Sequence, residues 1–323
     1  MVAFRYAPSV RRRHALVGGL AALGAVGVGV SGLVSASRAR AVDALTELRI
    51  GTGPPGGVFR EIGAALAAAV ASRLPGTQIR CIGTDASLQN LQLLDTGAVE
   101  LAFAAVDAVA AGLSLDVTAV ARLFDSWMQI FVPVESPITS LAQLNGRRVA
   151  AGAAGSGTRF TTDRLLAVAE LKPVLITATQ DDGAAQLAAG TVDAWFTCTG
   201  VPTPAVRTLA QRFRLRMLPL TPYLNDMTSR FGATYNVATL PSTTYQGVPG
   251  TATITTPNLL LARPEVPAEV VEAVLSGLFS ELSTIARDHP EANEINIRSG
   301  PATMPVRLHP GALHYFRSQK PFV

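Results

Sequence analysis

Two glycine-rich turns contain the residues whose types and spacing could bind a ligand. The first, Gly51 to Gly57, follows an apolar stretch and contains the G-x-G-x-x-G spacing of dinucleotide-binding turns. Pro54 and Pro55 stand in this turn, however, and proline has no N–H to donate to a pyrophosphate. The acidic residue expected about 20 positions later is also missing from the end of the next strand. The turn therefore predicts close approach of a small ligand to the backbone at the start of a helix.

The second turn, Gly155-Ser156-Gly157-Thr158, also opens a predicted helix. It lacks the lysine of a phosphate-binding P-loop and the G-x-S-x-G spacing of a serine nucleophile. Small residues and hydroxyls at a helix N-terminus suit an anion, above all a carboxylate, because amide donors and the helix dipole both favour negative charge there. A plain helix cap at this turn is the alternative.

Side chains for catalysis or metal binding are few. The four histidines are His14, near the N-terminus, and His289, His309 and His314, near the C-terminus. None belongs to an H-E-x-x-H, C-x-x-C or EF-hand pattern, so the sequence predicts neither a metal site nor a cofactor. Binding without chemistry is the favoured interpretation. The alternative is an exported enzyme on the same fold that acts on a small carboxylate.

The basic charge of the chain is confined to its N-terminus. The 323 residues contain 27 Lys and Arg against 23 Asp and Glu, but six of the arginines lie in residues 1–41, which hold no acid. The remaining 282 residues carry 21 basic and 23 acidic side chains, a net charge of −2. A weakly acidic body is unsuited to polyanions, so nucleic acid is not expected as a partner.

Residues 1–41 have the pattern of an export signal. Arg11 to Arg13 precede an uncharged run from Ala15 to Val34, and Ala39-Arg40-Ala41 resembles a cleavage site. The arginine cluster is typical of the twin-arginine route, which carries folded proteins. We therefore expect a mature chain that begins near Val42 and works in the periplasm or on the extracellular face of the cytoplasmic membrane. A retained membrane anchor is the alternative, because about 20 apolar residues can span a bilayer.

Strands and helices alternate along the rest of the chain in two series, and each series opens with a glycine-rich turn. The first series begins at residue 47 and the second after residue 135. Such alternation predicts parallel sheets covered by helices on both faces, and two series predict two similar lobes. We expect lobe 1 at 46–132 plus 258–323, lobe 2 at 133–257, and hinge strands near Gln129–Val134 and Thr253–Ala262. A ligand would then bind where the carboxyl ends of the strands face the cleft between the lobes.

The two cysteines, Cys81 and Cys198, lie in apolar runs that predict buried strands, one in each expected lobe. A disulfide between them would oppose movement of the lobes. We therefore expect both thiols to be buried and unpaired.

Seven segments carry a resemblance to a known family. In chain order they are Ile50–Gly53 with Gly56 and Gly57; Thr84, Ser87, Asn90 and Leu91; Gly97–Leu101 with Asp107; Leu144, Gly146 and Val149; Gly152–Thr158; Gly200–Pro204; and Leu308–Ala312 with Tyr315. Their order and spacing resemble those of the TAXI family, the solute-binding receptors that serve TRAP transporters. Phe59 and Arg60 depart from the pattern, because the family commonly has tyrosine there, and Glu100 stands where the family usually has aspartate.

The resemblance implies an α/β fold of the two-lobed, type II periplasmic-binding-protein-like class, in which each lobe is a mainly parallel sheet flanked by helices and hinge strands join the lobes. It also implies a receptor that captures a small carboxylate, such as glutamate or a related organic acid, and delivers it to a TRAP permease in the membrane. We expect the receptor to be a monomer. The residues expected to bind the solute are Thr52, Gly53, Gly56, Gly57, Phe59, Ser87 and Asn90 in lobe 1, Asp107 as the partner of a solute ammonium or as a helix cap, and Ser156, Gly157, Thr158, Thr199, Gly200 and Thr203 in lobe 2.

Overall fold

The computed structural model describes residues 45–111 and 116–319. The predicted export signal at 1–41 lies outside the described residues. Residues 41–323 make up one compact unit. Every helix within the described ranges is too short or too polar to cross a membrane.

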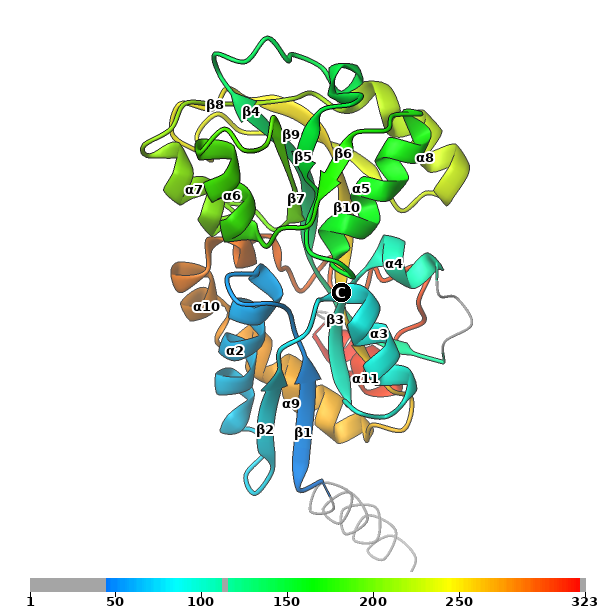
Figure 1. Cartoon of the computed structure of the whole chain (residues 1–323). Helices are drawn as coiled ribbons and strands as arrows, with labels where there is room; N and C mark the ends of the chain where they lie inside the picture. The colour runs from blue at the N-terminus through cyan, green and yellow to red at the C-terminus, as the bar shows by residue number, and fades with distance from the viewer. Residues whose placement is uncertain (1–44, 112–115, 320–323) are drawn as a thin grey trace, which may run out of the picture. The chain divides into compact units, whose positions relative to one another are not determined.

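Ten strands of the described chain form one mixed sheet (Figure 1). Its main path runs in the order β2-β1-β3-β10-β4-β7-β5-β6, with β8 added to β4 and β9 to β10. The strands are β1 (Glu47–Gly51), β2 (Gln78–Ile82), β3 (Leu101–Ala105), β4 (Thr118–Pro133), β5 (Arg148–Ala150), β6 (Val174–Ile176), β7 (Ala194–Thr199), β8 (Leu215–Met217), β9 (Asn236–Leu240) and β10 (Thr251–Ala262). Parallel pairs occur at both ends of the path, where β1 lies between β2 and β3 and β5 lies between β6 and β7. The long strands β4 and β10 are antiparallel to their neighbours and join the two parallel parts.

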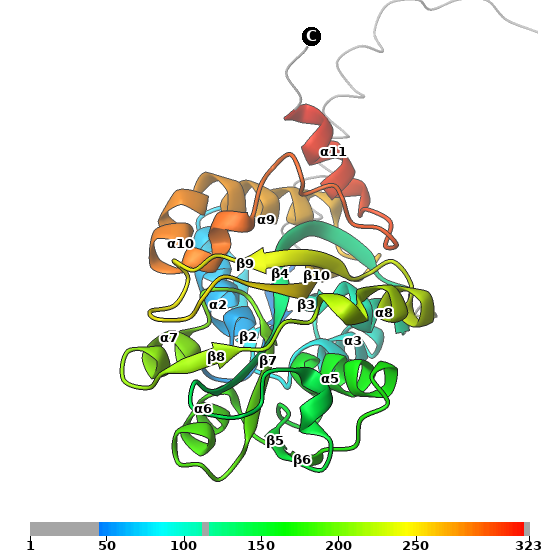
Figure 2. The same cartoon turned by 90° about the horizontal axis from the view of Figure 1, so that it is seen from above.

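Helices cover both faces of the two parallel parts. They are α2 (Val58–Ala71), α3 (Ser87–Asp95), α4 (Val106–Ala111), α5 (Gly157–Val168), α6 (Gln180–Ala188), α7 (Pro204–Ala210), α8 (Leu224–Phe231), α9 (Ala268–Ser280), α10 (Leu282–Asp288) and α11 (Pro310–Ser318), with 3-10 turns at Leu141–Leu144, Thr221–Tyr223 and Pro290–Glu294. In the upper half of Figure 1, α6 and α7 lie on one side of the strands and α5 and α8 on the other, and Figure 2 shows the same division from above.

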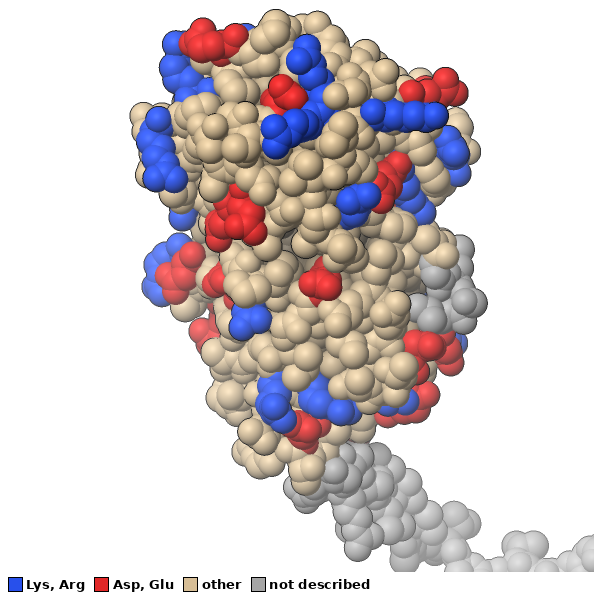
Figure 3. Space-filling view, viewed as in Figure 1, with Lys and Arg blue, Asp and Glu red and all other residues tan. Residues whose placement is uncertain are grey.

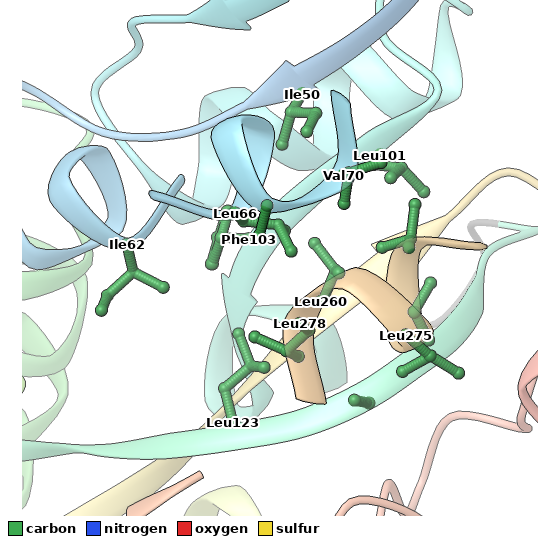
Figure 4. Packing of buried hydrophobic residues seen from close by; sticks show 14 of the residues in the cluster. Ile50, Ile62, Leu66, Val70, Leu101, Phe103, Leu123, Leu260, Leu275 and Leu278 are labelled. Atoms are coloured by element: carbon green, nitrogen blue, oxygen red, sulfur yellow. The ribbon is translucent and has the colours of Figure 1, made fainter. Parts of the chain in front are cut away.

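Buried apolar side chains form separate clusters in the two halves. Two clusters draw on Leu48–Phe124 and Leu259–Phe316, and two others draw on Met128–Ile254. We call the first half lobe 1 and the second lobe 2. In lobe 1 the helix α2 presents a side chain every four residues to the sheet and α9, and Figure 4 shows Ile62, Leu66 and Val70 in this layer. Each of these side chains is at most 1% exposed, and burying one stabilises the fold by about 1.5–3 kcal/mol.

The strands β4 and β10 carry the chain from one lobe to the other. In β4, residues up to Phe124 pack in the lobe 1 core and residues from Met128 pack in the lobe 2 core; in β10, Ile254 packs in lobe 2 and residues from Leu259 pack in lobe 1. The crossing in β4 directly precedes Gln129–Val134, near which the sequence predicts the hinge. The pairing of the two strands shifts register between Pro257, which has no N–H to donate to the ladder, and Leu259, and again between Leu260 and Leu261.

A half-buried carboxylate, that of Glu294, holds the segment of β4 that crosses between the lobes. Glu294, which ends a 3-10 turn, accepts hydrogen bonds from the backbone N–H of Asp125 at 2.7 Å and from Trp127 Nε1 at 3.1 Å. Burial raises the pKa of Glu294, and the nearby Asp125 charge acts in the same direction. The C-terminal part of lobe 1 is thereby tied to the strand that leads into lobe 2.

The expectation that both cysteines are buried is wrong for Cys81. This residue lies on β2, the edge strand of lobe 1, and is exposed, whereas Cys198 on the interior strand β7 is buried. Both thiols are free. An edge strand has a neighbour on one side only, so an apolar run of strand type does not ensure burial there.

The described surface has no single-sign patch on the face that Figure 3 shows, where Lys and Arg are interspersed with Asp and Glu. The described ranges also hold no group of three or more His, Cys, Asp or Glu side chains placed to bind a metal ion.

Candidate functional site

A cavity of about 60 Å³ lies between the two lobes, where the carboxyl ends of the parallel strands meet. A single water molecule needs about 10–15 Å³, so the cavity is larger than a one-water void. The cavity is lined by Pro54, Gly57, Val58, Phe59, Ala86, Ser87, Ala105, Ser126, Ser156, Gly157, Thr158, Thr161, Gln180, Cys198 and Thr199. A second chamber of about 30 Å³ shares part of this lining and extends toward Ala178, Trp195 and Phe196.

Four helices begin at the cavity. The first residues of α2, α3, α5 and α6 are Val58, Ser87, Gly157 and Gln180, and all four line the space. The first N–H groups of a helix have no acceptor within the helix, and the N-terminus carries a partial positive charge of roughly half an elementary charge. Two helices come from each lobe. Closed lobes therefore surround the cavity with backbone donors, the arrangement that suits an anion.

Lobe 1 contributes Ser87 and Phe59. The hydroxyl oxygen of Ser87 accepts a hydrogen bond from the backbone N–H of Ala105 at 3.1 Å, which leaves its hydrogen able to donate into the cavity. Ser87 is the first residue of α3, and the N-cap position before it is held by Ala86, which has φ 75° and ψ −140°. Phe59 packs its ring on Phe103 at 5.4 Å between centroids, so the aromatic wall of the cavity is also part of the lobe 1 core.

Lobe 2 contributes the turn before α5. Ser156 is the cap of this helix, because its hydroxyl oxygen accepts from the backbone N–H of Arg159 at 3.1 Å, and it also lines the cavity. The hydroxyl of Thr158 accepts from the backbone N–H of Cys198 at 3.0 Å and is thus used within lobe 2. Gly152 has φ 85°, and a Cβ there would lie 2.9 Å from Ser156 Oγ, so the turn needs glycine at this position.

The lining has no charged side chain. None of the described residues that line the cavity is Asp, Glu, Lys, Arg or His. Cys198 is the one lining residue with an ionisable thiol, and burial raises its pKa, with the nearby Asp107 charge acting in the same direction. A neutral buried thiol is a poor nucleophile. The cavity is therefore equipped to hold a solute by hydrogen bonds and helix dipoles.

Asp107 lies beside the cavity and joins the two lobes. Its Oδ1 accepts from the backbone N–H of Ala108 at 2.7 Å, and its Oδ2 accepts from Thr161 Oγ1 at 2.8 Å and from the Tyr235 hydroxyl at 2.9 Å. Arg164 donates to the backbone carbonyl of Asp107 at 3.2 Å. Burial raises the pKa of Asp107, while these hydrogen bonds and the Arg164 charge act against the rise. Both carboxylate oxygens are thus committed within the protein, and Asp107 does not line the cavity.

Of the fourteen residues predicted to bind solute, seven line the cavity: Gly57, Phe59, Ser87, Ser156, Gly157, Thr158 and Thr199. The other six besides Asp107 lie outside its lining: Thr52, Gly53, Gly56, Asn90, Gly200 and Thr203. The Asn90 side chain is used within lobe 1, because its Nδ2 donates to the carbonyls of Thr52 and Phe103 at 2.7 Å each. Thr203 accepts from Gln129 Nε2 at 3.1 Å inside lobe 2. These side chains hold the turns in place and leave no polar group for a solute.

Sequence reasoning missed Ala86, Ala105, Ser126, Thr161, Gln180 and Cys198 as well as two neighbours of the predicted residues, Pro54 and Val58. Gln180 could have been found, since it begins a helix, α6, that follows the strand β6, as α2 follows β1 and α5 follows β5. The strand-end residues carry no such signal, because the pairing of β3, β4 and β7 decides which of them face the cavity.

Comparison with known proteins supports the architecture. A sequence model of the NMT1-like family matches residues 50–319. A solved structure of a protein from Bordetella bronchiseptica RB50 is 16% identical, with a TM-score of 0.51, and the match covers 85% of this chain and 90% of that one. The alkanesulfonate-binding protein SsuA from Xanthomonas axonopodis pv. citri bound to MOPS is 20% identical over 85% of both chains, with a TM-score of 0.45. The periplasmic aliphatic sulphonate binding protein SsuA from Escherichia coli is 22% identical over 86% of this chain and 84% of that one, with a TM-score of 0.44.

At 16% identity the structure from Bordetella bronchiseptica RB50 bears on the fold alone. Because the family model covers most of the chain, the protein belongs to the NMT1-like family, and its α/β fold is that of the type II periplasmic solute-binding proteins.

Proposed function

We propose that the protein is an extracytoplasmic receptor that captures a small carboxylate-bearing solute in the cavity between its lobes. The observation that carries the proposal is the meeting of four helix N-termini, two from each lobe, in one small cavity without charged side chains. An anion there attracts both lobes at once, so binding favours the closed state.

The magnitudes favour an anionic solute. A helix N-terminus stabilises an adjacent negative charge by about 0.3–1 kcal/mol at an exposed site and by up to about 2 kcal/mol when partly buried. Each hydrogen bond to a charged group adds about 1.5–3 kcal/mol. Ser87 and Ser156 each have a hydroxyl hydrogen that can donate, one from either lobe, since their oxygens already accept from backbone N–H groups. A few such contacts account for micromolar binding, which corresponds to about −8 kcal/mol.

Delivery of the solute to a TRAP permease in the membrane is the second part of the proposal. It is supported by the resemblance of the seven sequence segments to the TAXI family, and export is supported by the pattern of residues 1–41. A monomer is sufficient for this role, because both lobes that surround the cavity come from one chain. Uptake of labelled solute into vesicles that contain a TRAP permease, with and without the receptor, tests this part. Uptake that requires an ATP-driven permease would contradict it.

The binding step is tested with Ser156→Ala and a matched cap variant. Both Ser156 and Ser140 cap a helical turn in lobe 2, but Ser140 does not line the cavity. Loss of either cap should lower the free energy of unfolding by about 1 kcal/mol. Only Ser156→Ala should also weaken carboxylate binding, by about tenfold or more, because a donor to the solute is lost.

Isothermal titration calorimetry with small carboxylates and with ethanesulfonate measures the effect. Equal affinity of Ser156→Ala and wild type would place the anion elsewhere. If ethanesulfonate binds more tightly than every carboxylate, the proposal of a carboxylate solute is wrong, while the proposed receptor function stands.

A further inference from the structure

The described lining of the cavity offers many hydrogen-bond donors and neutral acceptors but no carboxylate. The backbone N–H groups at the starts of four helices and the hydroxyls of Ser87 and Ser156 are donors toward the space. Gln180 supplies an acceptor: its Nε2 donates to Thr158 Oγ1 at 3.3 Å, and its buried Oε1 has no hydrogen-bond partner. An ammonium group carries three donors and a full charge, so it needs several acceptors or a carboxylate.

The acids near the cleft do not provide that carboxylate. Asp107, the buried one, has both oxygens occupied by Ala108, Thr161 and Tyr235. Asp85 and Asp181 lie where the lobes approach each other, but both are exposed and neither lines the cavity. A solute ammonium in the cavity would therefore face four positive helix ends with no carboxylate among the described lining residues to pair with it.

We infer that the solute is a small carboxylate without an ammonium group, with a hydroxyl as its hydrogen-bond donor. The inference rests on the proposed function and narrows it. The hydroxyl gives the unpartnered Gln180 Oε1 its donor, and the carboxylate takes the helix N-termini. An amino acid, including the glutamate that the family resemblance suggests, would bring its ammonium beside the helix N-termini without a carboxylate partner. The apolar lining by Val58, Phe59 and Ala105 and the second chamber near Trp195 leave room for a short carbon chain.

Matched pairs of probes that differ only in the second carbon's substituent test the inference. They are L-lactate and L-alanine, 2-hydroxybutyrate and 2-aminobutyrate, and 2-hydroxyglutarate and L-glutamate, each titrated into the purified protein by calorimetry. We expect a hydroxy acid to bind about 30-fold or more tightly than its amino counterpart, the ratio that loss of a charged group's partner produces. An amino acid that binds as tightly as its hydroxy counterpart would overturn this inference, but the proposed receptor function would stand. If no member of any pair binds, the proposed carboxylate function itself fails.

Gln180→Glu provides a test within the protein. The change keeps the shape of the side chain but turns the neutral acceptor into an anionic one, and an acidic residue at the first position of α6 is compatible with the helix dipole. We expect it to weaken hydroxy-acid binding and to shift the ratio toward the amino acid by about tenfold or more.

Gln186→Glu is the matched control, because Gln186 is on the same helix and also has an unpartnered Oε1, but does not line the cavity. It should leave the ratio unchanged. An identical shift in both variants, or none in Gln180→Glu, would contradict the assignment of the acceptor.

Discussion

The hydrogen bond from Tyr235 to Asp107 crosses between the lobes, and its removal should weaken solute binding without altering the cavity. In Tyr235→Phe the ring is retained, but Asp107 Oδ2 loses a donor that lies 2.9 Å away. Tyr235 does not line the cavity. A hydrogen bond to a charged group contributes about 1.5–3 kcal/mol, and water would replace it when the lobes open. The loss therefore falls on the closed state and should weaken solute binding by about 10- to 150-fold.

Tyr245→Phe is the matched control for this prediction. The Tyr235 hydroxyl makes two hydrogen bonds, since it also accepts from Arg164 Nη1 at 3.1 Å. The Tyr245 hydroxyl likewise makes two, donating to Gln129 Oε1 and accepting from the backbone N–H of Thr203, both at 2.8 Å, but all of its partners belong to lobe 2. Thermal unfolding and calorimetry on both variants separate the two effects. Both should melt at lower temperature, and only Tyr235→Phe should lose affinity. A Tyr235→Phe protein that binds the solute like wild type, although it is less stable, would refute the idea that this contact belongs to closure.

Three further outcomes are expected. Gly157→Val should abolish most solute binding with little change in the melting temperature of the unliganded protein, because a Cβ at this position already lies 3.5 Å from Ser87 Oγ of the other lobe; calorimetry checks it. Ala86→Gly should raise the free energy of unfolding by about 0.5–2 kcal/mol in urea titrations, since glycine relieves the positive φ at 75°. Burial lowers the pKa of His309, so the unfolded chain takes up its proton first as the pH falls below about 6.5, and stability should drop by up to about 1.4 kcal/mol per pH unit there. Urea unfolding at pH 8 and pH 5.5 should show a larger loss for wild type than for His309→Asn.

The fold could be predicted from the sequence because its signals are local. The four-residue spacing of Val58, Ile62, Leu66 and Val70 states which face of α2 is buried, and each of these residues is at most 1% exposed. The alternation of strands and helices also placed the site at the strand ends. Apolar periodicity does not reveal the break at Glu281, which divides the C-terminal helical segment into α9 and α10.

The site was predicted only in part, because the sequence shows which hydroxyls are present and not which groups already satisfy them. Asn90 and Thr203 have the residue types of ligand contacts, yet both are used inside their own lobes. Thr161 and Gln180 face the cavity through tertiary contacts that no local pattern records. Asp107 shows the same limit, since its partners Thr161 and Tyr235 come from distant parts of the chain.

The two crossings of the chain between the lobes have a consequence for its synthesis. The lobe 2 core is built from the uninterrupted stretch Met128–Ile254, so it can fold as soon as that stretch has left the ribosome. The lobe 1 core unites residues from Leu48 to Phe124 with α9 and α11, and it stays incomplete until Phe316 emerges. At about 5–20 residues per second, the interval between the two events is roughly 3–12 s. During that time β1, α2 and β3 expose the apolar face that α9 will cover, so the part of the chain made first is the last to be protected from aggregation.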